Sequence, residues 1–225
     1  MIQWKILSAA IAVGALISIY VRRRRSLTAR RIIQPITTTL VIVLAASGCL
    51  FPGSNTIYTM LVVLYLIFCL IGDCYLVDFK DNNLVLVALG FYWAGIIVYS
   101  VVLTRRTGFN LTDLTAFIIL LIGCGLAIAL FLWKGLGKMK APVIIYILTW
   151  CYLLSQSLTI FWSDSVFFSA TQKWLILAGT GIFFLGDIII SFHQFNEKFQ
   201  KKLLWMDVPL YYTGQGLIAI STSFF

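Results

Sequence analysis

The sequence predicts an all-α, polytopic membrane protein with eight transmembrane helices in one integral membrane domain, residues 1–225. Of its residues, 61% are hydrophobic and only 11% are charged. A helix that crosses a bilayer needs about 20 mainly apolar residues, and the apolar runs of this chain reach that length repeatedly. The 17 lysines and arginines lie almost entirely between the runs, where they indicate topology and not a nucleic-acid-binding surface.

The apolar runs follow one another with turn-forming or basic residues between them. The first run precedes an arginine cluster and lacks a small-residue cleavage site, so we expect it to remain as a span and not to be cleaved as a signal peptide. The breaks, in order, are Arg22–Arg31, Phe51–Asn55, Lys80–Asn83, Arg105–Gly108, Lys134–Pro142, Trp162–Ser165 and Asn196–Asp207. The helices expected between them cover residues 3–20, 32–50, 56–78, 84–104, 112–133, 142–162, 171–193 and 208–225.

The basic residues are unevenly divided between the two sides of these helices. The first, third, fifth and seventh breaks hold 13 of the 17 lysines and arginines. Lys5, Arg105, Arg106 and Lys173 are the four on the other side. Because cytoplasmic loops are enriched in lysine and arginine, we expect both termini to be non-cytoplasmic.

Two of the expected spans each carry an aspartate directly after a glycine, as Gly72-Asp73 and Gly186-Asp187. A carboxylate at the centre of a membrane helix costs roughly 2.5–3.5 kcal/mol on insertion scales, so such residues usually mark a functional site. The bland alternative is a polar clamp between helices. Each aspartate follows its helix start by about sixteen residues in helices that run in the same direction, which places both in the cytoplasmic half of the bilayer.

If these two helices are neighbours, the aspartates meet in surroundings of low dielectric constant. Two adjacent carboxyls there cannot comfortably both ionise, so one should retain a proton near neutral pH. We therefore take Asp73 and Asp187 as candidate catalytic residues, an acid and a base in one pocket.

Four further polar residues lie on the same side of the membrane as the aspartates and are candidates for substrate binding. They are Tyr146, Tyr211, Tyr212 and Gln215. The tyrosines have an alternative role as interfacial belt residues, and the glutamine as a link between helices. In the opposite half we expect few polar groups besides Tyr99 and Gln156. The five cysteines have no CxxC spacing and no nearby histidine, so we expect no metal and no cofactor.

Segments four helices apart also correspond weakly. Gln34-Pro35 and Ala141-Pro142 each open a span after a basic loop, and the two Gly-Asp pairs lie one span later. This pattern suggests a 4+4 internal duplication in parallel orientation, although so few matching positions can also coincide by chance.

Several short motifs occur together in one order, and this ordered set is fairly specific. They are Gln34-Pro35, Gly72-Asp73-x-x-Leu76, Pro142 with Tyr146, Gly179-x-x-x-Phe183-x-x-x-Asp187 and Tyr211-Tyr212-x-x-Gln215. In this respect the chain resembles the YhhN-like lysoplasmalogenase family of integral membrane proteins over about residues 31–225. Two positions depart from that family, because Ile96 replaces a common histidine and Gly186 a common serine.

The resemblance implies hydrolysis of the vinyl ether bond of lysoplasmalogens, which releases a fatty aldehyde and glycerophosphocholine or glycerophosphoethanolamine. Asp73 and Asp187 would act as acid and base, while Tyr146, Tyr211, Tyr212 and Gln215 would hold glycerol oxygens or water. The implied partners are a lysophospholipid substrate and membrane lipids, with no nucleic acid. The implied location is the endoplasmic reticulum membrane in a eukaryote or the inner membrane in a bacterium.

Three other functions fit the same aspartates. An intramembrane aspartyl protease also pairs two carboxyls, but its Gly-x-Gly-Asp and Pro-Ala-Leu motifs are replaced here by Ile71-Gly72-Asp73 and Val208-Pro209-Leu210. A proton-coupled transport protein would need polar residues along its whole path. A catalytically inactive lipid-binding protein is compatible with the loss of the histidine at position 96.

Overall fold

The computed structural model describes residues 2–23, 27–51, 54–76, 81–108, 110–163, 167–196 and 206–224. Within them the chain is helical throughout, without strands. The helices are α1 (Ile2–Arg23), α2 (Leu27–Ala46), α3 (Thr56–Tyr75), α4 (Asn82–Thr107), α5 (Leu111–Ala127), α6 (Lys140–Trp162), α7 (Ala170–Phe195) and α8 (Asp207–Ser221). Short 3₁₀ turns cover Ser47–Leu50 and Gly137–Met139, and a π-helix covers Ile128–Leu132.

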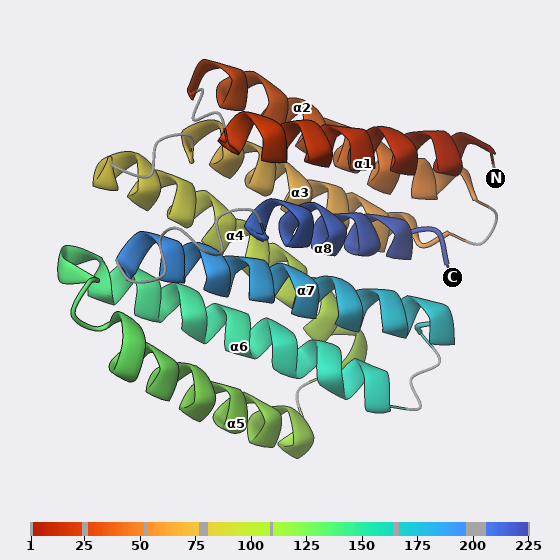
Figure 1. Cartoon of the computed structure of the whole chain (residues 1–225). Coiled ribbons are helices and arrows are strands. Elements are labelled where there is room, and N and C mark those ends of the chain that lie inside the picture. Colours follow the sequence, from red (N-terminus) through yellow and green to blue (C-terminus); the bar gives the residue numbers. More distant parts are fainter. Residues whose placement is uncertain are drawn as a thin grey trace.

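The helices run up and down beside one another in a bundle, with both ends of the chain at the same end of the bundle (Figure 1). α8 lies in the middle, where it packs on α7, α2 and α1. α5 lies at the edge and packs on α6, while α4 joins the two halves by packing on both α3 and α6. Helices from distant parts of the chain therefore surround α8 and α3.

Each expected helix is present, but several ends differ. The span expected at 32–50 is α-helical only to Ala46 and finishes as a 3₁₀ turn, and the span at 112–133 continues from Ala127 as a π-helix. α4 begins two residues early because the side chain of Asp81 accepts hydrogen bonds from the backbone of Asn83 (2.9 Å) and Leu84 (3.4 Å). The ends expected at 78 and 225, and six of the 13 predicted cytoplasmic basic residues, lie outside the described residues.

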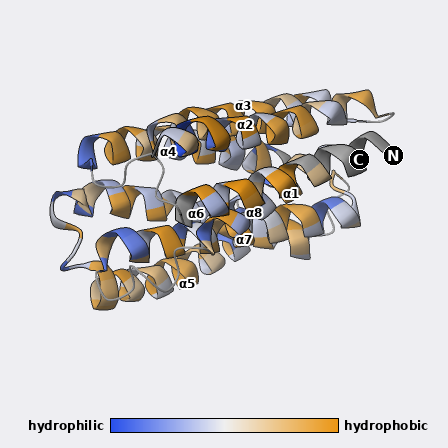
Figure 2. Cartoon of the chain, turned by 45° about the horizontal axis from the view of Figure 1, so that its top comes forward, coloured by the Kyte–Doolittle hydropathy of each residue, from blue (hydrophilic) through white to orange (hydrophobic). Residues whose placement is uncertain are grey.

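Six of the helices in the described part of the chain are long and apolar enough to cross a membrane, which makes the protein a multi-pass membrane protein. They cover Thr28–Leu50, Thr56–Tyr75, Asn82–Arg105, Leu111–Leu132, Gly137–Trp162 and Ala170–Phe195. The expectation of eight spans is therefore supported only for six. The apolar stretch Ile11–Val21 within α1 and the 15-residue α8 are shorter than a span. Figure 2 shows hydrophobic residues along most of the helices and hydrophilic ones mainly toward helix ends.

The interior of the bundle is rich in aromatic residues. Trp150, Tyr65, Tyr99 and Phe183 are among its largest fully buried side chains. In an apolar window of 18 residues, 61% of the residues are buried in the α6 span but only 6% in the α5 span, so α6 lies in the interior of the bundle and α5 at its lipid-facing edge. This contrast follows from the membrane, because lipid accepts apolar side chains as readily as a protein core does.

α7 and α8 approach each other closely at Gly214. A Cβ atom on this residue would lie 2.7 Å from Cβ of Phe183 and 2.8 Å from the carbonyl oxygen of Gly179. The contact brings the middle of α8 against α7. As a result, the ring of Tyr211 packs edge-on against Phe183, with 5.0 Å between ring centroids. Small residues at such crossings are typical of membrane helix pairs.

Candidate active site

Asp73 is buried near the end of α3, and three hydroxyl groups from three other helices surround it. Tyr92 of α4 donates to Oδ1 at 2.6 Å, and Tyr211 of α8 donates to the same oxygen at 2.9 Å. Thr38 of α2 donates to Oδ2. The preceding Gly72 makes room for this arrangement, because a Cβ atom there would lie 2.9 Å from the Tyr92 ring. Both oxygens of Asp73 are thus held by donors that stabilise an anion.

Asp187 of α7 is only partly buried, and its surroundings differ from those of Asp73. Its Oδ2 accepts hydrogen bonds from the hydroxyl of Tyr146 (2.5 Å) and from Nε1 of Trp150 (2.8 Å). Both donors come from α6 and lie one turn apart on the same face. Among the described residues no donor reaches Oδ1. One oxygen of this carboxyl is therefore fixed and the other is available.

Both aspartates line one pocket with a volume of about 840 Å³, including its open mouth. The polar part of the wall also includes Gln34, Ser191 and Asp207, and the rest is largely apolar. The pocket lies among the last turns of α3 and α7 and the first turns of α4, α6 and α8. This is the end of the bundle away from the chain termini (Figure 1).

The predicted substrate-binding residues have different positions. Tyr146 and Tyr211 line the pocket and each donates a hydrogen bond to an aspartate. Tyr212 also lines the pocket and donates to the backbone carbonyl of Gln34 at 3.2 Å. Gln215 is fully buried one turn further along α8 and is not part of the pocket wall. The structure therefore brings the three tyrosines to the pocket and leaves the glutamine below it.

Three residues that bind the aspartates were not found by sequence reasoning. Thr38 and Trp150 carried a readable signal, because each lies four residues after a residue already singled out, Gln34 and Tyr146 respectively, and so shares its helix face. Tyr92 had no such signal. Its contact with Asp73 depends on how α4 packs against α3, which spacing within one helix does not reveal.

Ile96 stands where the histidine of the resembling family was expected. Its side chain is 1% exposed, and it lies one turn from Tyr92 but outside the pocket lining. In this chain the adjacent hydrogen-bonding group of α4 is therefore Tyr92, which points at Asp73. The isoleucine belongs to the apolar core.

The expectation of few polar groups in the opposite half of the bundle was wrong. There the hydroxyl of Tyr58 lies 3.3 Å from that of Tyr99 and 2.8 Å from that of Ser221. Gln172 of α7 donates to the carbonyl of Ser221 at 3.1 Å. Tyr58 and Ser221 were overlooked because they lie at helix ends, where polar residues are ordinary. The cluster ties α3, α4, α7 and α8 together.

No group of three or more histidine, cysteine, aspartate or glutamate side chains is close enough to hold a metal ion within the part of the chain that the structure describes. The five cysteines are all free thiols.

These observations define a class of protein: a multi-pass helical membrane protein with two inequivalent carboxyls in a pocket near one end of its bundle. The model of the YhhN family matches residues 29–222, so the chain belongs to the YhhN family. No curated protein and no solved structure matches the chain.

Proposed function

We propose that this protein is a lysoplasmalogenase-type hydrolase. It cleaves the vinyl ether bond of lysoplasmenylcholine or lysoplasmenylethanolamine to a fatty aldehyde and glycerophosphocholine or glycerophosphoethanolamine. Family membership supports the class of reaction. One observation supports the mechanism above all others: Asp73 and Asp187 share a pocket, yet their hydrogen bonds prepare them for different roles.

In this proposal Asp187 is the acid and Asp73 the anion. The three hydroxyls that donate to Asp73 stabilise a negative charge on it. Asp187 has donors on Oδ2 alone, so Oδ1 carries the proton toward the pocket. Two carboxyls with separate tasks around a cation are also the arrangement that glycosidases use.

The reaction begins when Asp187 donates its proton to the alkene carbon on the chain side of the vinyl ether. The π electrons form the new C–H bond, and the remaining positive charge is shared by the adjacent carbon and the ether oxygen. Asp73 stabilises this cation. Water then adds to the carbon and gives up a proton to the Asp187 carboxylate. The resulting hemiacetal collapses as its C–O bond to glycerol breaks, the glycerol oxygen gains a proton and the hydroxyl loses one, which leaves the aldehyde.

The mouth of the pocket suits a lysophospholipid head group. Met139 lines the pocket, and Lys138 and Lys140 flank it in the sequence; Nζ of Lys140 lies 4.4 Å from the centroid of the Trp133 ring. Lysines at this end of the bundle can attract a phosphate. Tyr212 and Gln34 line the same wall and offer polar groups to the glycerol hydroxyl. Because the rest of the wall is apolar, the alkene can lie beside the two carboxyls without bulk water around it.

The proposal includes eight spans, a 4+4 duplication and non-cytoplasmic termini. The neighbours of the helices support the duplication: α2 packs on α3 as α6 packs on α7, and α3 packs on α4 as α7 packs on α8. α2 also packs on α8 as α6 packs on α4, and α1 packs on α2 as α5 packs on α6, whereas the contact of α1 with α8 has no comparable counterpart between α5 and α4 among the described residues. α8 can be shorter than the hydrocarbon thickness of a bilayer because α7, α2 and α1 pack around it. Tags on both termini that are accessible only from the non-cytoplasmic side would support this topology.

The test is aldehyde release from purified protein and lysoplasmenylethanolamine. Asp73→Asn and Asp187→Asn should each abolish release while the protein remains folded. Asp81→Asn is the matched control, because this residue is an exposed helix cap that asparagine can replace. In heavy water, the aldehyde should carry one deuterium on the carbon next to the carbonyl. Full activity in both pocket variants would refute the proposal, and a folded wild type without activity would favour the inactive lipid-binding alternative.

A further inference from the structure

A second cavity lies beside the first, between α6, α7 and the π-helical end of α5. Its volume is about 450 Å³, including the open space at its mouth. Its wall is mostly aliphatic and aromatic, and includes Ile128, Leu132, Ile147 and Phe184. The first cavity, by contrast, is lined by both carboxyls and by further polar side chains such as Gln34 and Gln194. The two cavities therefore differ in polarity as the two ends of a lysolipid do.

The two cavities meet at Asp187. Tyr146, Asp187 and Ser191 line both of them, and Trp150, the second donor to Asp187, lines the apolar one. A lysolipid that lies across this junction places its head group in the first cavity and its hydrocarbon chain in the second. The bond between these two parts then lies at the carboxyl that has an available oxygen.

We propose that the second cavity binds the hydrocarbon chain of the lysolipid substrate and sets the preferred chain length. This inference rests on the proposed function, because it assigns a second part of the same substrate to a second part of the same site. Bilayer lipid is as apolar as the cavity, so moving the chain between them changes the free energy little. The cavity therefore adds little to the binding free energy of the substrate. Its effect is to orient the substrate so that the alkene lies at Asp187.

The π-helix shapes the outer wall of this cavity. The backbone N–H of Trp133 bonds to the carbonyl of Ile128 at 2.8 Å, and this wider turn directs Ile128 and Leu132 inward while Leu130 stays exposed. Single π-turns inside α-helices often lie at functional sites. The exposed outer face of α5 makes this wall the boundary between the cavity and lipid.

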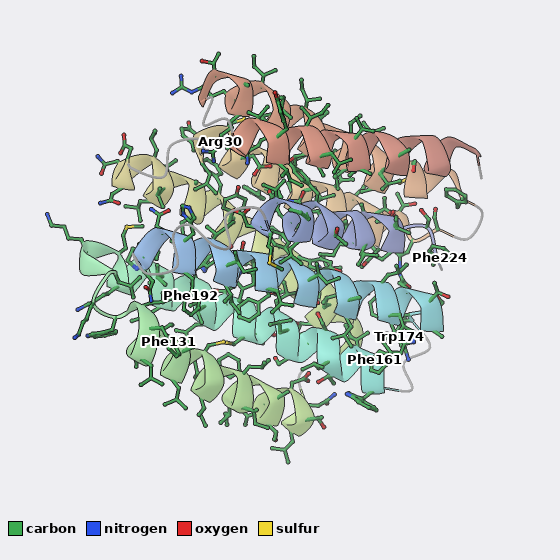
Figure 3. The ribbon with its side chains drawn as sticks, in the orientation of Figure 1. Arg30, Phe131, Phe161, Trp174, Phe192 and Phe224 are labelled. Atoms are coloured by element: carbon green, nitrogen blue, oxygen red, sulfur yellow. The ribbon has the colours of Figure 1, made fainter. Side chains whose placement is uncertain are left out.

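Two aromatic rings join α5 and α7 at this boundary. The rings of Phe131 and Phe192 lie 5.9 Å apart at one end of the two helices (Figure 3). Phe192 lines the cavity and Phe131 is exposed, and Asn196 donates to the Phe131 carbonyl at 2.9 Å.

The test compares Ala127→Phe with Ile122→Phe. Ala127 lines only the second cavity, so phenylalanine there shortens the space for the chain, whereas Ile122 is on the exposed face of the same helix. Ala127→Phe should lower kcat/KM for a long-chain lysoplasmenylethanolamine by about tenfold or more, and leave a medium-chain substrate within about twofold. Ile122→Phe should leave the ratio unchanged. Equal loss for both chain lengths, or no change for either, would overturn the inference.

A second measurement separates this inference from the proposed function. The probe is an uncleavable saturated alkyl-ether lysophospholipid with a diazirine at the end of its chain, bound to the full protein and photolysed. Labels on the peptides around Ala127–Leu132 and Phe184–Phe192, reduced by Ala127→Phe, support the chain site even if the wild type releases no aldehyde. Labels confined to α1–α4 would overturn the chain site even if aldehyde release is normal.

Discussion

The neighbouring tyrosines at the start of α8 give the sharpest prediction, because the same substitution removes two different kinds of hydrogen bond. Tyr211→Phe removes a hydroxyl that lies 2.9 Å from Oδ1 of Asp73. Tyr212→Phe removes one that lies 3.2 Å from a neutral carbonyl, that of Gln34. Neither change leaves a cavity of any size, and the Tyr211 ring keeps its packing against Phe183.

The expected magnitudes follow from the charge on the acceptor. A hydrogen bond to a charged group contributes about 1.5–3 kcal/mol and one between neutral groups about 0.5–1.5 kcal/mol. If Asp73 is the anion that stabilises the cation, losing its donor should lower kcat/KM roughly 10- to 150-fold, since about 1.4 kcal/mol is a factor of ten in rate. Tyr212→Phe should cost roughly 2- to 12-fold, mainly in KM, because it touches no carboxyl.

The assay is the initial rate of aldehyde release over a range of lysoplasmenylethanolamine concentrations, with thermal unfolding of both variants as the control for folding. Both proteins should unfold close to the wild-type temperature. An equal loss in the two variants, or a larger one for Tyr212→Phe, would show that Asp73 does not act as a charged group held by Tyr211.

Three further predictions concern other parts of the chain. Trp150→Phe removes the 2.8 Å donor to Asp187 and should lower kcat about tenfold or more with little change in KM, as measured by the same assay. Gly72→Ala places a Cβ atom 2.9 Å from the Tyr92 ring. The initial rate of aldehyde release should therefore fall, while the unfolding temperature should change little. Asp81→Ala removes the cap of α4 and should lower the free energy of unfolding by about 0.5–2 kcal/mol, while the activity of the folded protein stays at the wild-type level.

Six of the helices could be predicted from the sequence because their apolar runs have the length that a bilayer imposes, and this constraint acts within a single segment. The π-helix at Ile128–Leu132 could not, because its apolar residues suit an α-helix equally well. The role of α8 was also hidden. Its 15 residues are enclosed by other helices, so its burial depends on tertiary packing and not on its own length.

The aspartates were found because an intramembrane carboxyl is costly wherever its helix lies. Their partners required knowledge of which helices touch. Tyr146 and Tyr211 were selected by depth alone and do reach the carboxyls, whereas Gln215, selected by the same argument, is buried below the pocket. Depth along the membrane normal therefore identifies the layer in which a residue lies, but not the direction in which its side chain points.

The inequivalence of the two carboxyls arises from a difference between the helices around them. If α3 and α7 are related by duplication, then α2 and α4, which flank α3, correspond to α6 and α8, which flank α7. Asp73 accepts hydrogen bonds from both flanking helices, α2 and α4, and a third from α8. Within the described part of the chain, Asp187 receives donors from α6 alone, and both of them bond to Oδ2. In the proposed reaction, these two similar positions would have opposite tasks: Asp73 would remain an anion while Asp187 would deliver a proton.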